Sequence, residues 1–117
     1  MANEIIHAEV VGKDGPKLQK FFGDLFDWSL NTDLPGGYGL AEKTGGSGAD
    51  FGAGPSPDGG SGWVTFYVRV PDIEATLAKA ASLGGAVVMP KFTAGNATLA
   101  MVADPEGHVN GLTEGSM

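Results

Sequence analysis

Residues 63–70 alternate between apolar and more polar side chains in a segment rich in β-branched and aromatic residues. This alternation predicts a strand with two different faces. The apolar face carries Val64, Phe66, Val68 and Val70. The other face carries Thr65, Tyr67 and Arg69. Because the second face is too polar for an ordinary core, the sequence raises the question of what it contacts.

A helix is predicted directly after this strand. Pro71 cannot continue a ladder of strand hydrogen bonds, and Asp72 can accept hydrogen bonds from the first free N–H groups of a helix. From Ile73 onward, apolar residues recur at helical spacing. Gly84-Gly85 is expected to end the helix, because glycine adopts the left-handed cap conformation without a steric clash.

The first part of the chain repeats this order of strand and helix. Residues 4–11 predict a strand, and its more polar face carries Ile5, His7 and Glu9. Asp14 is the predicted N-cap of a helix with Pro16 in its first turn. The apolar stripe of that helix consists of Leu18, Phe21, Phe22 and Leu25.

Several shorter strands are predicted in each half of the chain. They are residues 28–31, 38–42, 49–53, 86–89, 97–103 and 108–113. Residues 54–62 are rich in Gly, Pro and Ser, a composition typical of a flexible connector. The two halves therefore share one pattern of strand, helix and three strands, and this is a repeat of pattern rather than of sequence.

Composition excludes several classes of function. The chain has 117 residues, a formal net charge of −7 and no cysteine. An acidic chain of this kind lacks the basic surface that nucleic acid or an anionic membrane requires, so neither partner is expected. The start of the sequence shows no secretory signal, and the absence of cysteine excludes disulfides and thiolate metal sites. We expect a cytoplasmic protein.

Five short segments stand in a distinctive order along the chain: Ile6-His7, KFFGDLFDW at 20–28, VRVPDI at 68–73, LGG at 83–85 and DPEGH at 104–108. In this order they resemble segments of the vicinal oxygen chelate superfamily, which includes glyoxalase I, bleomycin-resistance proteins and extradiol dioxygenases. The resemblance covers nearly the whole chain, although each segment alone is a weak motif.

The resemblance implies an α+β fold built from two βαβββ modules. Module one would span about residues 4–53, the connector 54–62, and module two about 63–114. The modules would form curved mixed sheets with a cup-like cavity, with helices on the outer face. His7, Thr65 and Tyr67 would face the cup, while the helices would cover Ile6, Ala8, Val10, Val64, Phe66 and Val68. A short chain like this one resembles the members of the family that form homodimers, so a homodimer is expected.

The metal site of the family is incomplete in this sequence. By resemblance, its metal enzymes use His or Gln on the first strand of each module and Glu on the last strand. His7 matches the first of these positions, but Thr65 is a poor ligand and Gly111 has no side chain. Asp50 could substitute in module one. A metal needs several convergent donors, so we expect no cofactor, with a divalent ion at His7 and Asp50 as the open alternative.

The predicted ligand site lies on the faces that would line the cup. Its residues are His7, Thr65, Tyr67, Arg69, Trp63 and Met101. His7 is the best candidate for a catalytic group, as a general base or a hydrogen-bond donor, although a histidine on a core strand is more often a hydrogen-bonded structural residue. Glu9 on the same face could orient His7 or oppose it.

These observations lead to one functional prediction and two alternatives. The prediction is a metal-free protein that binds a small, partly apolar molecule in its cup, in a sequestration or resistance role like that of the bleomycin-resistance relatives. The first alternative is a glyoxalase-like lyase or a dioxygenase with a divergent metal site. The second is a dimeric scaffold without a ligand.

Overall fold

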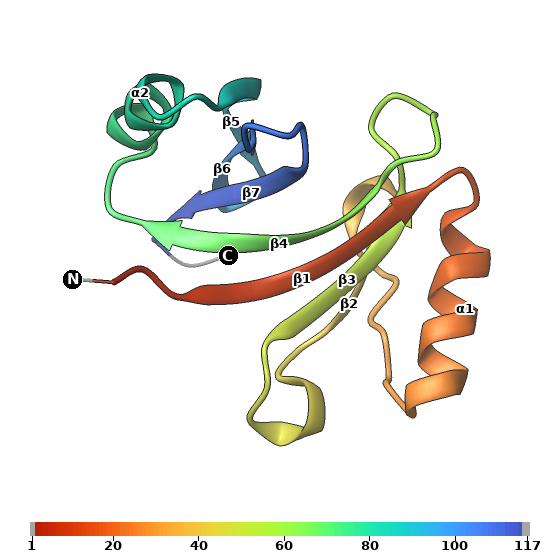
Figure 1. Ribbon diagram of the computed structural model, residues 1–117. Helices are drawn as coiled ribbons and strands as arrows, with labels where there is room; N and C mark the ends of the chain where they lie inside the picture. The colour runs from red at the N-terminus through yellow and green to blue at the C-terminus, as the bar shows by residue number, and fades with distance from the viewer. Residues whose placement is uncertain (1, 116–117) are drawn as a thin grey trace. The chain divides into compact units, whose positions relative to one another are not determined.

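A computed structural model describes residues 2–115, which belong to two compact units (Figure 1). The N-terminal unit is His7–Thr65, and the C-terminal unit comprises the described residues before His7 and from Phe66 onward. Two strands, β1 (Ile5–Gly12) and β4 (Trp63–Val70), contribute residues to both units. The predicted module boundaries remain a prediction from pattern, but the predicted connector starts too early, because Gly54 and Pro55 belong to a strand that pairs with β1.

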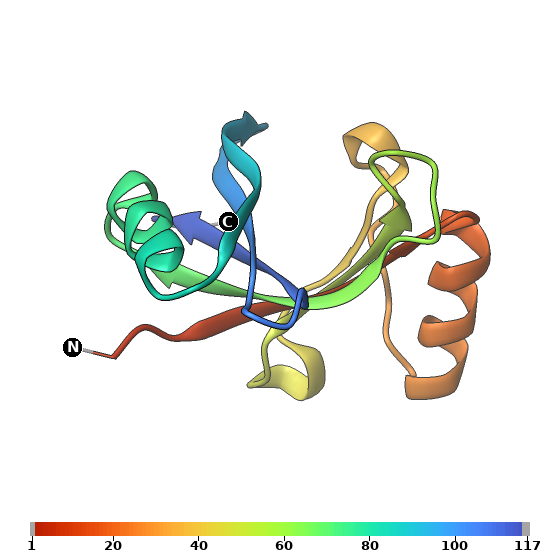
Figure 2. The same cartoon turned by 45° about the horizontal axis from the view of Figure 1, so that its top comes forward.

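The N-terminal unit contains a mixed sheet in the order β2-β3-β1. β1 pairs in parallel with β3 (Asp50–Pro55), and β3 pairs antiparallel with β2 (Gly39–Ala41). Helix α1 (Gly15–Phe26) follows β1 after a short connection, as Figure 2 shows. Two short 3₁₀ helices flank β2, namely η1 (Pro35–Gly37) and η2 (Thr44–Gly46).

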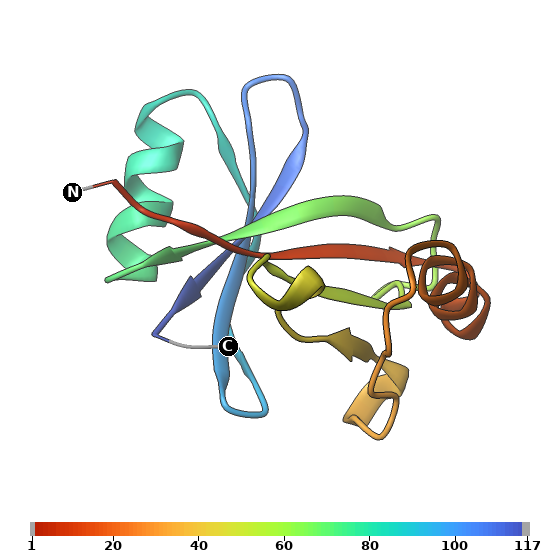
Figure 3. The ribbon, with the colours of Figure 1, turned by 90° about the horizontal axis from the view of Figure 1, so that it is seen from below.

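The C-terminal unit contains a second mixed sheet in the order β4-β7-β6-β5. β4 pairs in parallel with β7 (Val109–Glu114), and the other two pairs are antiparallel. The remaining elements are α2 (Ile73–Ser82), β5 (Ala86–Ala94) and β6 (Ala97–Ala103). α2 contacts the β5–β6 hairpin, which Figure 3 shows beside the helix. The predicted α+β class with mixed sheets is confirmed.

Two strand predictions need correction. The segment predicted as a strand at 28–31 forms only an isolated bridge, between Asn31 and Leu40. The strand predicted at 86–89 continues through Pro90 to Ala94, with irregular register between Val87 and Phe92. β5 lies at the end of the strand order, and edge strands tolerate proline because only one of their sides is hydrogen-bonded to a neighbour.

The apolar stripe of α1 divides between the core and the surface. Leu18 and Phe22 pack against the N-terminal core around Phe51. Phe21 and Leu25, predicted in the same stripe, are 56% and 57% exposed. The predicted stripe is therefore wider than the surface of the sheet that α1 covers.

A corresponding difference separates the two ends of β4. Val68 and Val70 pack with Ile73 and Leu77 of α2 in the C-terminal core. Val64 and Phe66 were expected under a helix as well, but they are 79% and 43% exposed. This expectation was wrong because the core beside α2 includes only the last part of the strand.

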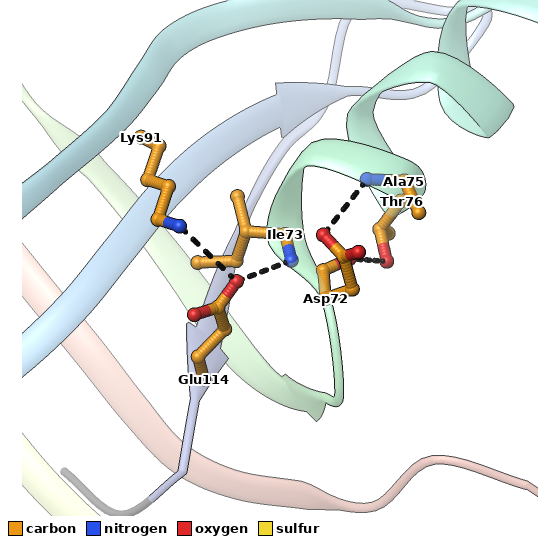
Figure 4. A network of polar contacts seen from close by, with 6 residues as sticks. All are labelled: Asp72, Ile73, Ala75, Thr76, Lys91 and Glu114. Carbon is orange, nitrogen blue, oxygen red and sulfur yellow. Dashed lines mark hydrogen bonds and ion pairs between the residues drawn. The ribbon is translucent and has the colours of Figure 1, made fainter.

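The start of α2 is held by two carboxylates from different elements (Figure 4). Asp72 is the N-cap, as predicted, and its side chain accepts from the N–H of Ala75 at 3.1 Å. Glu114, on β7, accepts from the N–H of Ile73 at 2.6 Å and lies 3.7 Å from the Lys91 ammonium. Negative charge at a helix N-terminus is favourable, so the end of the last strand helps to fix this helix.

Among residues 2–115, no helix is both long enough and apolar enough to span a membrane.

Candidate functional site

The buried polar face of β1 is the starting point of the candidate site. His7 is 2% exposed and Glu9 is 7% exposed. Their Cα partners on β3 are Asp50 and Gly52, respectively. α1 packs against the opposite face of β1, which carries Ala8 and Val10. The sequence therefore places an ionisable pair on the side of the strand away from the helix, as the alternation predicted.

Tyr38 joins these two side chains. Its hydroxyl oxygen lies 2.7 Å from Nε2 of His7 and 3.0 Å from Oε1 of Glu9. The second carboxylate oxygen of Glu9, Oε2, accepts from the indole Nε1–H of Trp63 at 2.8 Å. His7, Glu9, Tyr38 and Trp63 thus form one connected network, called here the Glu9 cluster.

The chemistry of the Glu9 cluster determines the tautomer of His7. A carboxylate can only accept hydrogen bonds, so the Tyr38 hydroxyl uses its one proton to donate to Glu9. The hydroxyl oxygen then accepts from His7, which requires the hydrogen of the neutral ring to be on Nε2. Nε2–H is consequently committed to Tyr38, and a protonated ring nitrogen cannot ligate a metal.

His7 is held in its neutral form by burial. Desolvation lowers the pKa of His7 below its usual 6.5, although the negative charges of Glu9 and Asp50 act in the opposite direction. The burial effect is the largest of the three. A neutral imidazole at physiological pH agrees with the tautomer that the hydrogen bonds require.

The ring of Tyr38 depends on two glycines in β3. A Cβ atom at Gly52 would overlap the phenol end of Tyr38, and one at Gly54 would lie 3.1 Å from its Cδ1. Alternate residues of a strand share one face, so this face of β3 has no side chains at the two positions that Tyr38 covers. Glycine in a strand interior often marks such a close approach.

The C-terminal unit repeats this arrangement with different residues. Tyr67 of β4 is the Cα partner of Gly111 on β7, and Gly111 is the partner of Met101 on β6. A Cβ at Gly111 would overlap the ring of Tyr67, which is 5% exposed. Met101 is 1% exposed. Gly111 therefore lies between a tyrosine and a methionine, whereas Gly52 lies beside the ionisable pair of the Glu9 cluster.

Arg69 is already engaged in the C-terminal unit. Its Nη1 lies 2.5 Å from the Glu4 carboxylate, and its Nε donates to the Gly115 carbonyl at 2.6 Å. Arg69 is half-exposed, and its two partners, Glu4 and Gly115, lie near the two ends of the described residues. It therefore forms a surface ion pair. Arg69 was predicted in the ligand site, and these two partners already engage its guanidinium group.

The residues present do not fit the family's metal site. The β1–β3 and β4–β7 registers place Gly52 and Gly111 at equivalent positions, opposite Glu9 and Tyr67. Tyrosine rings cover both glycines. Asp50 lies two residues away and accepts from the N–H of Lys43 at 2.9 Å. No group of three His, Cys, Asp or Glu side chains within residues 2–115 is arranged to hold a metal ion.

The structure brings some predicted site residues together and separates others. His7 and Trp63 belong to the Glu9 cluster, and Thr65 lies buried in the same unit. Tyr67 and Met101 lie on either side of Gly111 in the C-terminal unit. Tyr38 was missed, because it stood at the start of the strand predicted at 38–42 and no functional pattern surrounded it. The alternating glycines of β3 were the available signal.

Comparison with known proteins identifies the class. The sequence model of the Glyoxalase/Bleomycin resistance protein/Dioxygenase superfamily matches residues 4–112, so the chain belongs to this superfamily. The chain is 32% identical over 106 residues to the "Putative glyoxylase CFP32" of Mycobacterium bovis and of Mycobacterium tuberculosis. This match covers 85% of the chain but 41% of each relative, so the chain spans about two fifths of their length.

Solved structures agree on the fold. Methylmalonyl-CoA epimerase from Mycobacterium tuberculosis is similar with a TM-score of 0.68 and 19% identity, over 97% of this chain and 88% of that one. A superfamily member from Vibrio splendidus is similar with a TM-score of 0.64 and 18% identity, over 97% and 100% of the two chains. At these identities the likeness establishes the fold alone.

Proposed function

We propose that this chain is a metal-independent member of the superfamily that binds a small, partly apolar organic molecule at the Glu9 cluster. The observation that carries the proposal is the presence of tyrosine rings over both glycines, Gly52 and Gly111, at the strand positions where a metal enzyme needs acidic side chains. The space for those side chains is filled.

The Glu9 cluster supplies what a binding site for such a molecule needs. Tyr38 and Trp63 are half-buried and cover the more deeply buried His7 and Glu9. Binding sites for small molecules generally combine aromatic walls with a few fixed polar groups. The cluster has both, and its polar groups are oriented by hydrogen bonds to one another.

Metal content and ligand binding test this proposal together. Elemental analysis of the purified protein is expected to find no stoichiometric zinc, nickel, manganese or iron. Thermal shift against a panel of metabolites and antibiotics is expected to find a stabilising ligand, and a ligand at 100 times its Kd stabilises by about 2.7 kcal/mol. About one bound metal ion per chain, lost in His7→Ala, would overturn the metal-independent reading.

A glyoxalase-like lyase is the second candidate, and the relatives in Mycobacterium whose name includes glyoxylase favour it. Turnover of the adduct of methylglyoxal and glutathione, measured with and without added zinc or nickel, distinguishes the two. Turnover that requires added metal would support the lyase and contradict the binding protein. No turnover, together with a ligand found by thermal shift, would support the binding protein.

A further inference from the structure

A surface hollow between the end of β1 and the start of α1 is a second candidate site. It has a volume of about 530 Å³, and all of its lining residues belong to the N-terminal unit. Of the Glu9 cluster, only Trp63 lines it. We propose that this hollow binds a small organic carboxylate, with its charge at Lys13 and Lys17 and its apolar body against Trp63 and Val64. The proposal concerns a different site from the proposed function and goes beyond it.

The apolar walls of the hollow come from three elements. Val10 of β1, which lies on the face opposite Glu9, and Leu18 of α1 are half-buried at the N-terminal core. Trp63 and Val64 begin β4, and Val64 is 79% exposed. The Trp63 N–H donates to Glu9, so the indole offers the hollow its ring. A ligand with an apolar body would remove this valine and this ring from water, which is favourable.

The backbone around the hollow is closely packed. A Cβ atom at Gly62 would overlap the Val11 carbonyl, and one at Gly12 would lie 3.2 Å from Cδ1 of Leu18. The chain that enters β4 therefore passes close to the end of β1, and α1 starts against the same place. These contacts fix the spacing of the walls before any ligand binds, and a pre-formed site binds with a smaller loss of conformational entropy.

The charges at the hollow favour an anion. Lys13 and Lys17 both line it and are both exposed. Within residues 2–115, neither lysine forms an ion pair, whereas Lys20 and Lys91 do. Asp14 also lines the hollow, but its side chain is the N-cap of α1 and accepts from the N–H of Lys17 at 3.0 Å. Two lysines against one aspartate leave one surplus positive charge, in a chain whose formal net charge is −7.

One surplus positive charge suits a ligand with one negative charge. A carboxylate carries one at neutral pH, whereas a phosphate monoester carries about 1.5 to 2. Lysine ammonium groups on flexible stems can donate to a carboxylate in several directions. The hollow of about 530 Å³ lies within the range of about 300–1,000 Å³ that is typical of ligand sites, so an apolar body has room beside the walls.

Five probes that differ in one feature each test the proposal. They are 3-phenylpropanoate, the neutral 3-phenylpropan-1-ol, the cationic 3-phenylpropan-1-amine, 3-phenylpropyl phosphate, and propanoate, which lacks the apolar body. Binding is followed by NMR at the indole N–H signal of Trp63, and Trp28→Phe assigns the two tryptophans. Trp28 lines a different hollow, so its signal is the internal control. The phenyl acid should bind about fivefold more tightly than the alcohol, because exposed charge pairs are individually weak. The amine and propanoate should bind more weakly than the alcohol.

Variants at exposed positions locate the effect without disturbing the core. Lys13→Gln and Lys17→Gln should each reduce the preference for the acid over the alcohol to about twofold, and the double variant should remove it. Lys79→Gln removes the same charge from an exposed lysine that does not line the hollow, and it should keep the preference. Val64→Thr keeps the branched shape but makes the wall polar, so it should weaken the acid and the alcohol alike.

Each other result would overturn the proposal. Equal affinity of acid and alcohol, or tighter binding of the amine, would remove the role of the lysines. Tighter binding of the phosphate would contradict the carboxylate, and propanoate binding as tightly as the phenyl acid would contradict the apolar body. A preference that survives the double lysine variant would place the acid at another site, including the Glu9 cluster. A Trp63 signal unchanged by all five probes would exclude binding in the hollow and would leave the test of the proposed function to the thermal-shift panel.

Discussion

In both the N-terminal and the C-terminal unit a tyrosine ring covers a strand glycine, but the two tyrosines come from different places in the chain. In the N-terminal unit the ring over Gly52 comes from Tyr38, in the turn before β2. In the C-terminal unit the ring over Gly111 belongs to Tyr67, which lies on the paired strand itself. The common feature is the strand glycine, and the source of the covering ring differs.

The difference in polarity between the two places is more informative. Tyr38 connects His7 to Glu9, so the covered glycine of the N-terminal unit lies beside a buried ionisable pair. Tyr67 and Met101 flank Gly111, and neither is an acid-base pair of the kind that lies beside Gly52. The two repeats of one pattern therefore differ in what lies beside the covered glycine: an ionisable pair in the N-terminal unit, and a tyrosine and a methionine in the C-terminal unit. The predictions below test how far each depends on its glycine and on its charges.

Gly111→Ala should have the largest effect on stability. The new methyl group would overlap the Tyr67 ring from Cγ to Cε2, and this ring is only 5% exposed. Overpacking of this kind costs about 3 kcal/mol of unfolding free energy. Gly52→Ala should cost less, about 1 kcal/mol, because it meets the phenol end of half-buried Tyr38, which can swing outward.

Urea denaturation followed by circular dichroism measures both changes, with Gly54→Ala as the control. A Cβ at Gly54 would lie 3.1 Å from Tyr38 Cδ1 and 3.2 Å from its Cα, a close but tolerable contact. Its effect should be the smallest of the three. If Gly52→Ala destabilises more than Gly111→Ala, the proposed freedom of Tyr38 to move is wrong.

Particular residues show how much of the fold and of the candidate site the sequence could predict. The alternation at 4–11 and 63–70 depends on local side chains, so it correctly predicted both long strands and the buried side of His7. Tyr38 could not be predicted as the partner of His7, because 31 residues separate them and only the β1–β3 register brings Gly52 beside Glu9. Long-range pairing of this kind leaves little trace in a local pattern.

The connector shows the same limit. Its composition predicted a flexible segment from residue 54, but Gly54 and Pro55 belong to β3. Ser56 is buried, and its N–H donates to the Gly12 carbonyl at 2.8 Å. Parallel pairing with β1 orders these residues, and composition alone does not register that interaction.

Tyr38→Phe should have the next largest effect on stability, and the change is confined to the Glu9 cluster of the N-terminal unit. The variant keeps the ring over Gly52 but removes the hydroxyl that joins His7 to Glu9. Leaving buried polar groups without this partner costs about 2 kcal/mol. Urea denaturation measures the loss, and unchanged stability would show that the hydroxyl contributes little to the Glu9 cluster.

The pH dependence of stability should report on the buried His7 of the N-terminal unit. Burial lowers the pKa of folded His7 below 6.5, so the unfolded chain binds a proton more readily than the folded chain does. Stability should therefore fall as the pH is lowered below 6.5, by at most about 1.4 kcal/mol per pH unit for one proton. His7→Gln should flatten this part of the profile.

His108→Gln provides the matched control for that measurement. His108 is exposed, and its ring lies 3.0 Å from the Asp104 carboxylate in a surface turn of the C-terminal unit. Its replacement should leave the slope below pH 6.5 in place, because the desolvation that produces it acts on His7. If the slope disappears in His108→Gln but persists in His7→Gln, it comes from His108 in the C-terminal unit, and the prediction for His7 is wrong.

The smallest predicted effect compares the starts of the two helices. α1 has one capping carboxylate, Asp14, which accepts from the N–H of Lys17 at 3.0 Å, whereas α2 has Asp72 and also Glu114. Glu114→Gln keeps an acceptor for the Ile73 N–H but removes the charge, so it should cost about 0.5 kcal/mol, and the loss should shrink in high salt. Urea denaturation at low and high salt measures it, with Glu106→Gln as the control for net charge. A loss that is unchanged by salt would mean that Glu114 acts through its hydrogen bond to the Ile73 N–H. The contribution of this second carboxylate to α2 would then be to position the helix against β7, and not to supply charge.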